Sequence, residues 1–181
     1  MTIFLSGGAK CGKSSLAQEL TLKLANGGRH YYVATMIPTG AEDYERIRLH
    51  LLDRSGMGFE TVECAKNVMD CLETANPDGA FLVDSVTSLM QNALFPAEKN
   101  YELDLAGAKR CVDELIAFAA TVRHAVFVSD DIYSDPGRYD PGTEQYRKCL
   151  ADADRRLAQV CDIVVEVSSG QVIVYKGVMP K

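Results

Sequence analysis

The chain has 181 residues, of which 47% are hydrophobic and 24% charged, and its net charge is −6. This balance suits one soluble domain over residues 1–181, and no apolar stretch approaches the ~20 residues that a membrane span needs. The negative charge argues against a nucleic-acid partner, and the early first strand leaves no room for a targeting segment, so we expect a cytoplasmic protein.

Short apolar runs predict strands at 2–5, 31–34, 60–63, 80–84, 125–129, 162–167 and 171–175. Helical periodicity predicts helices at 13–25, 42–54, 65–75, 86–95, 104–122 and 143–159. This alternation predicts a mostly parallel sheet with helices on both faces, and the short turn at 168–170 predicts a final antiparallel hairpin. Residues 96–100 and 133–142 are predicted loops, and the second is either a lid or a plain surface loop.

The segment between the first strand and the first helix fits the Walker A pattern of a phosphate-binding loop; it reads Gly7-Gly8-Ala9-Lys10-Cys11-Gly12-Lys13-Ser14. Glycines let backbone N–H groups converge on phosphate oxygens, and the helix N-terminus adds partial positive charge. Lys13 is expected to reach the β- and γ-phosphates and Ser14 to ligate Mg²⁺. The chain is therefore predicted to bind a nucleoside triphosphate, GTP or ATP.

Carboxylates follow two later strands, at the edge of a parallel sheet where ligands bind. Asp84 ends a buried strand as a Walker B carboxylate does, and its expected role is to hold Mg²⁺. Asp130 and Asp131 end the next buried strand. They could orient a substrate hydroxyl or act as a base, or they could be a solvated strand end or a helix cap.

His50 lies on a predicted helix with Arg46 and Arg54 at i−4 and i+4, so the three side chains form one stripe. Tyr44, Ile47 and Leu51 form a neighbouring apolar face that is expected to pack on the body of the protein. A histidine between two arginines is expected to stay neutral, and a neutral imidazole is a nucleophile toward phosphorus. The alternative is an exposed basic helix face.

These segments resemble the adenosylcobinamide kinase/adenosylcobinamide-phosphate guanylyltransferase family of cobalamin biosynthesis, over nearly the whole chain. The specific matches are the Gly-Gly-Ala opening of residues 7–14 and the R-I-x-x-H-x-x-x-R pattern of residues 46–54. Supporting matches lie at 32–35, which ends in Ala34-Thr35, at 60–63 and at 84–92.

The resemblance implies a RecA-like P-loop NTPase fold and a bifunctional transferase. One activity phosphorylates adenosylcobinamide, and the other moves GMP from GTP through His50 to the phosphorylated product. It also implies a homotrimer, a guanosine-binding acid at Glu63, and phosphate contacts from Arg46 or Arg54. Further nucleotide contacts are expected at Ala34, Thr35, Met36, Leu51, Leu52 and Asp53.

The chain departs from the family pattern in the half of the sequence furthest from the nucleotide motifs. Residues 130–133 read Asp-Asp-Ile-Tyr where the family has Asn-Glu-Val-Gly, and residues 151–155 lack the pattern Gly-x-x-Asn-Gln. A P-loop kinase with another small acceptor is therefore one alternative. A regulatory NTPase, in which hydrolysis only switches conformation, is another.

Overall fold

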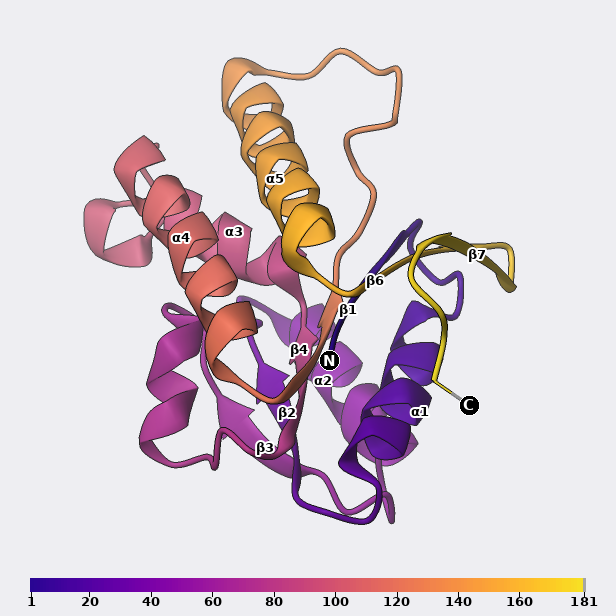
Figure 1. The fold of residues 1–181 in the computed structure, drawn as a ribbon. Helices are drawn as coiled ribbons and strands as arrows, with labels where there is room; N and C mark the ends of the chain where they lie inside the picture. The colour runs from indigo at the N-terminus through magenta and orange to yellow at the C-terminus, as the bar shows by residue number, and fades with distance from the viewer. Residues whose placement is uncertain (181) are drawn as a thin grey trace.

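The computed structural model describes residues 1–180, which build a seven-stranded sheet between two layers of helices (Figure 1). The strands are β1 (Thr2–Gly7), β2 (His30–Ala34), β3 (Glu60–Glu63), β4 (Ala80–Asp84), β5 (His124–Val128), β6 (Ile163–Ser168) and β7 (Gln171–Lys176). The α-helices are α1 (Lys13–Ala25), α2 (Ala41–Asp53), α3 (Val86–Leu94), α4 (Leu105–Thr121) and α5 (Pro141–Val160), and the 3₁₀ helices are η1 (Val68–Glu73) and η2 (Ala97–Lys99).

The strand order across the sheet is β3-β2-β4-β5-β1-β6-β7. Every pair of neighbours is parallel except β6 and β7, which form the predicted antiparallel hairpin at one edge. β5 lies between β1 and β4, with Leu5 opposite Val128 and Val128 opposite Asp84. The carboxyl ends of β1, β5 and β4 therefore meet side by side, which is where ligands bind in such sheets.

Alternating side chains of the strands supply two separate cores. Ile3 and Leu5 on β1 join Leu20 of α1 on one face. Phe4 points to the other face, where η1, α3, α4 and α5 pack, with Phe118 as a central aromatic residue. Both faces are therefore covered, which explains why the strand sequences are almost continuously apolar.

Most predicted elements are confirmed, with bounds within about two residues of those expected. The predicted α-helix at 65–75 is wrong, because the chain forms only the 3₁₀ helix η1 there. The Asn67 side chain accepts a hydrogen bond from the Met69 backbone N–H at 2.9 Å, so a local turn competes with an earlier helix start. Within residues 1–180, no helix combines the length and hydrophobicity that crossing a membrane requires.

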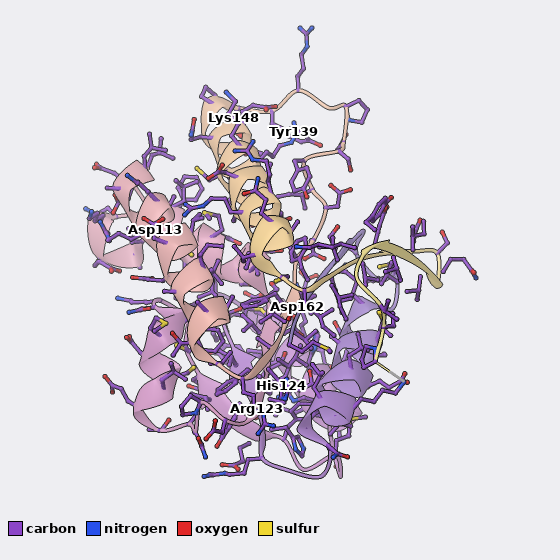
Figure 2. The ribbon with its side chains drawn as sticks, viewed as in Figure 1. Asp113, Arg123, His124, Tyr139, Lys148 and Asp162 are labelled. Atoms are coloured by element: carbon purple, nitrogen blue, oxygen red, sulfur yellow. The ribbon has the colours of Figure 1, made fainter. Side chains whose placement is uncertain are left out.

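The segment before α5 is fastened to that helix. Arg147 donates hydrogen bonds to the carbonyl oxygens of Tyr133 and Gly137, both at 3.1 Å, and its guanidinium lies 5.0 Å from the centre of the Tyr139 ring. Figure 2 shows Tyr139 on the outer loop beside the start of α5, away from the sheet. A lid function for this loop stays a prediction.

Candidate functional site

The connection between β1 and α1 has the backbone of a tight phosphate-binding loop. Gly7 has a φ of +150°, and a Cβ atom there would lie 2.2 Å from the carbonyl oxygen of Val167, so only glycine fits. Gly12 precedes the helix with a φ of +99°, again in a conformation that favours glycine. The two glycines thus set the path of the loop between them.

The N-terminus of α1 carries no side-chain cap and no acidic residue in its first turn. By contrast α3, α4 and α5 are capped by the side chains of Ser85, Asp104 and Asp140. Backbone N–H groups in the first turn of a helix need an acceptor, and the helix dipole favours an anion there. The loop and the start of α1 therefore form a site suited to a phosphate group.

Lys13 holds its ammonium group at this loop, with only 5% of its side chain exposed. The Nζ atom donates to the carbonyl oxygens of Gly7 at 2.9 Å and Gly8 at 2.6 Å, and it lies 3.0 Å from Oδ1 of Asp130. Asp130 is therefore far from the phosphate loop in the sequence but lies beside it in the folded chain. The strand order brings β5 next to β1, and Asp130 follows β5.

Asp84 ends β4 and has 11% of its side chain exposed. Its Oδ2 atom accepts a hydrogen bond of 2.9 Å from the Tyr32 hydroxyl and lies 3.8 Å from Nδ1 of His50. Burial raises the pKa of Tyr32, with the Asp84 charge adding to the rise, so the phenol stays protonated and remains a donor. Sequence reasoning missed Tyr32 because it looked like an ordinary apolar strand residue.

A cavity of about 480 Å³ lies beside α2 and the ends of β2, β3 and β4. Of the expected site residues, those that line it are Ala34, Thr35, Met36, Arg46, His50, Leu51, Arg54, Glu63 and Asp84. Leu52 is 56% exposed, and it and Asp53 lie outside this lining. Asp84, which lines the cavity, ends β4, whereas the phosphate loop follows β1. These two strands are two strand spacings apart, or ~10 Å.

The apolar face of α2 does not pack on the body of the protein as expected. Tyr44 is 63% and Leu51 is 51% exposed, and no residue of α2 is buried. Tyr44, Ile47 and Leu51 line the open cavity instead. The periodicity therefore identified the correct face of the helix, but that face meets a ligand-sized space and not a core.

Arg46 and Arg54 have different surroundings, although they lie on one stripe with His50. Arg54 is only 7% exposed, donates to the His50 carbonyl oxygen at 3.0 Å, and stacks 3.5 Å above the Tyr32 ring. It therefore anchors the end of α2 to β2. Arg46 is exposed and lines the cavity, so its guanidinium is the one available to a phosphate.

Thr35 has no exposed side-chain surface, so it does not present its hydroxyl to the cavity. Its Oγ1 atom donates to the Ser85 carbonyl oxygen at 2.9 Å and accepts from the Ser85 N–H at 2.6 Å. Asn92 of α3 donates to the carbonyl oxygens of Thr35 and Ala65 at 2.9 and 2.8 Å. These bonds join the ends of β2 and β4 and the segment after β3 around the cavity.

The ligands that the sequence predicts for Mg²⁺ are the Asp84 carboxylate and the Ser14 hydroxyl, both oxygen ligands of the type that Mg²⁺ prefers. Among residues 1–180, no group of three or more His, Cys, Asp or Glu side chains is placed to hold a metal ion by itself. An Mg²⁺ ion bound together with a triphosphate takes one or two protein ligands, and the remaining ligands are phosphate oxygens and water. The donor set therefore fits a nucleotide-bound Mg²⁺.

Asp154 of α5 is buried, at 3% exposure. Its Oδ2 atom accepts hydrogen bonds from the hydroxyls of Ser129 at 2.9 Å and Tyr133 at 3.0 Å, whereas Oδ1 has no partner among the described residues. Burial raises the pKa of Asp154 to about 7, and the nearby charges of Asp131 and Asp130 add to the rise. Sequence reasoning did not single out this carboxyl, because only the fold shows its burial.

The buried Asp154 predicts that the protein loses stability as pH rises. The folded chain keeps this proton up to about pH 7, whereas the unfolded chain releases it near pH 4, so the free energy of unfolding falls between these values. The expected loss is on the order of 2–4 kcal/mol. Urea unfolding at about pH 5 and about pH 8 should show a smaller loss for Asp154→Asn than for the natural chain. Equal losses in the two proteins would contradict this assignment.

A family model described as cobinamide kinase / cobinamide phosphate guanyltransferase matches residues 3–174 of the chain. No curated protein sequence matches the chain. Among solved structures, a protein of Pyrococcus horikoshii OT3 is similar at 12% identity with a TM-score of 0.51, covering 98% of this chain and 86% of that one. An ATPase from the type III secretion system of pathogenic bacteria is similar at 14% identity with a TM-score of 0.56, covering 92% of this chain.

The chain spans about half of that ATPase, 51% of its length, and at these identities the likeness concerns the fold. The predicted RecA-like P-loop NTPase fold, with its mostly parallel sheet and C-terminal antiparallel hairpin, is confirmed.

Proposed function

The chain belongs to the cobinamide kinase / cobinamide phosphate guanyltransferase family, and we propose that it phosphorylates adenosylcobinamide and then transfers GMP from GTP to the product. The observation that carries the proposal is the place of His50. It lines a cavity with Asp84 and lies 3.8 Å from that carboxylate, which ends a strand two strand spacings from the strand that leads into the phosphate loop. A kinase alone needs no nucleophilic histidine in its nucleotide cavity.

In the kinase step, the phosphate loop and the N-terminus of α1 bind the triphosphate. Lys13 exchanges the carbonyl oxygens of Gly7 and Gly8 for phosphate oxygens and stabilises the charge that develops on them. Ser14 and Asp84 would hold a nucleotide-bound Mg²⁺, directly or through water, and the ion would supply positive charge at the phosphates. The acceptor hydroxyl attacks the γ-phosphorus, and the nucleoside diphosphate leaves with the electrons of the broken P–O bond.

In the guanylyl step, the side chain of His50 attacks the α-phosphorus of GTP. Its Nδ1 atom faces Asp84, so a proton on Nδ1 leaves the lone pair on Nε2 free to form the P–N bond. Pyrophosphate leaves with the electrons of the broken P–O bond, and Lys13 stabilises its charge. A phosphate oxygen of adenosylcobinamide phosphate then attacks the same phosphorus, and the bond to His50 breaks.

The cavity also offers groups suited to the guanosine part. Glu63, at the end of β3, presents a carboxylate that can accept hydrogen bonds from guanine N–H groups or ribose hydroxyls. Tyr44, Ile47 and Leu51 supply apolar surface for the face of the base. We assign Arg46 to the α-phosphate, since Arg54 is already engaged by Tyr32 and the end of α2.

We also propose the family's homotrimer for this chain, in the cytoplasm. Support comes from β7 and the residues after it, whose apolar side chains are exposed: Val172, Ile173, Val174, Tyr175 and Val178. A run of this kind on an edge strand favours contact with another chain. Light scattering during gel filtration would give the mass of the assembly.

Product analysis tests the proposed function directly. The chain is incubated with adenosylcobinamide, Mg²⁺ and either ATP or GTP, and the corrinoid is then analysed by mass spectrometry. We expect addition of a phosphate with at least one of the two nucleotides, and further addition of GMP only with GTP. Phosphorylation without GMP addition would indicate a kinase alone. Hydrolysis with no change in the corrinoid would indicate another acceptor or a regulatory NTPase.

A further inference from the structure

Asp130 occupies the position between the two parts of the site. It follows β5, the strand between β1, which leads into the phosphate loop, and β4, which ends in Asp84. Its Oδ1 atom lies 3.0 Å from Nζ of Lys13, and 26% of its side chain is exposed. A carboxylate is therefore held at the place where the γ-phosphate would meet Lys13, and a solvent-exposed part of it is open to a second substrate.

Three hydrogen bonds fix the backbone on both sides of this carboxylate. The N–H of Ser129 donates to the Leu5 carbonyl oxygen at 2.9 Å, and the N–H of Asp131 donates to the Gly7 carbonyl oxygen at 3.0 Å. The N–H of Asp130 itself donates to Oγ1 of Thr87, in the first turn of α3, at 2.8 Å. The carboxylate is thus positioned by a rigid strand end, as a group that must meet a reacting atom needs to be.

The neighbouring Asp131 is placed differently. Its Oδ2 atom accepts a hydrogen bond from the Ser134 hydroxyl at 2.7 Å, and its Oδ1 atom is buried with no partner within residues 1–180. The two adjacent carboxylates, which are equivalent in the sequence, are therefore separated by the fold. Asp130 faces the phosphate loop, and Asp131 faces the loop that follows.

We propose that Asp130 orients the acceptor hydroxyl in the kinase step and takes its proton, an inference that rests on the proposed function. When a triphosphate draws Lys13 onto its phosphate oxygens, the Asp130 carboxylate is released from their ion pair and can accept the hydroxyl's hydrogen bond. The acceptor oxygen forms a bond to the γ-phosphorus, the bond from that phosphorus to the β,γ-bridging oxygen breaks, and the hydroxyl proton passes to Asp130. The nucleoside diphosphate leaves with the electron pair.

A purely structural role for Asp130, as the counter-ion of Lys13, makes a different prediction. Lys13 is needed for both activities, so a loss of its counter-ion would change both. A proton acceptor for the hydroxyl is needed only in the kinase step, because His50 attacks GTP through a nitrogen lone pair. Comparing the two activities in one variant therefore separates the two roles.

The experiment measures adenosylcobinamide phosphorylation and GMP labelling of the protein in Asp130→Asn, which keeps the size and shape of the side chain. We expect the phosphorylation kcat to fall by about 100- to 10,000-fold, the size of a general-base contribution. The KM values and the rate of GMP labelling should stay within about threefold of the natural chain. Asp130→Glu should recover part of the lost kcat, because it restores the carboxylate.

Asp131→Asn is the matched control, since it removes the same charge one residue away, and it should keep the natural kcat. Thermal unfolding of each variant shows that the comparison is made on folded protein. An unchanged kcat in Asp130→Asn, or an equal loss of phosphorylation and GMP labelling, would overturn the inference alone. A natural chain that does not phosphorylate adenosylcobinamide would overturn the proposed function, and the inference with it.

Discussion

A Lys13→Ala chain is expected to lose adenosylcobinamide phosphorylation and GMP transfer together, each by at least about 100- to 1,000-fold. The buried ammonium is the cation placed at the phosphate loop, where it contacts two loop carbonyl oxygens and Asp130. Both steps drive negative charge onto a leaving phosphate group at this loop. Initial rates of both reactions, measured at saturating nucleotide where this can be reached, would give the two losses.

The matched control is Lys23→Ala, which removes a lysine from the last turn of the same helix. Lys23 is 40% exposed and pairs with Glu19 on the same helix, so both activities should remain. Lys13→Met keeps the apolar length of the buried side chain and separates loss of charge from loss of packing. Retention of full activity in both Lys13 variants would show that neither reaction depends on the lysine of the phosphate loop.

A His50→Ala chain is expected to lose GMP transfer to below detection while it keeps much of the kinase activity. Only the guanylyl step needs a covalent bond to the histidine, whereas phosphoryl transfer uses Lys13 and the carboxylates at the strand ends. The two products, adenosylcobinamide phosphate and its GMP adduct, are separated and quantified in the same reaction. Adenosylcobinamide phosphate should accumulate without conversion to its GMP adduct.

His124→Ala serves as the histidine control. His124 begins β5, its Nδ1 atom lies 3.2 Å from the N-terminal nitrogen of Met1, and Figure 2 shows it far from Tyr139. Both activities should remain in this variant. Equal loss of the two activities in His50→Ala, with unchanged thermal unfolding, would show that His50 is not a dedicated nucleophile.

Much of the fold could be predicted because the local sequence patterns agree with the positions of the strands and turns in the sheet. The buried strands are short and almost entirely apolar, and the glycines of the phosphate loop lie where β1 turns into α1. The exception is the segment at 65–75, where an asparagine side chain and a 3₁₀ turn replaced the expected helix. The apolar spacing correctly indicated that Val68 and Cys71 are buried, but a 3₁₀ turn buries them as well as an α-helix would.

The candidate site was predictable only as separate residues. The spacing on α2 identified the stripe that carries His50, but nothing local indicated that Arg54 would stack on Tyr32 or that the apolar face would line a cavity. The Lys13–Asp130 pair joins residues 117 positions apart, and it exists because β5 is inserted between β1 and β4. Strand order is a long-range property, and single-sequence periodicity does not report it.

The central claim is that His50 becomes covalently linked to GMP, and intact-protein mass spectrometry tests it most directly. The natural chain and His50→Ala are each incubated with GTP and Mg²⁺, without a corrinoid acceptor, and weighed. We expect a mass increase equal to one GMP in the natural chain, lost on acid treatment but stable to alkali, as a phosphoramidate is, and absent from His50→Ala. No adduct on the natural chain, or the same adduct on His50→Ala, would contradict the account.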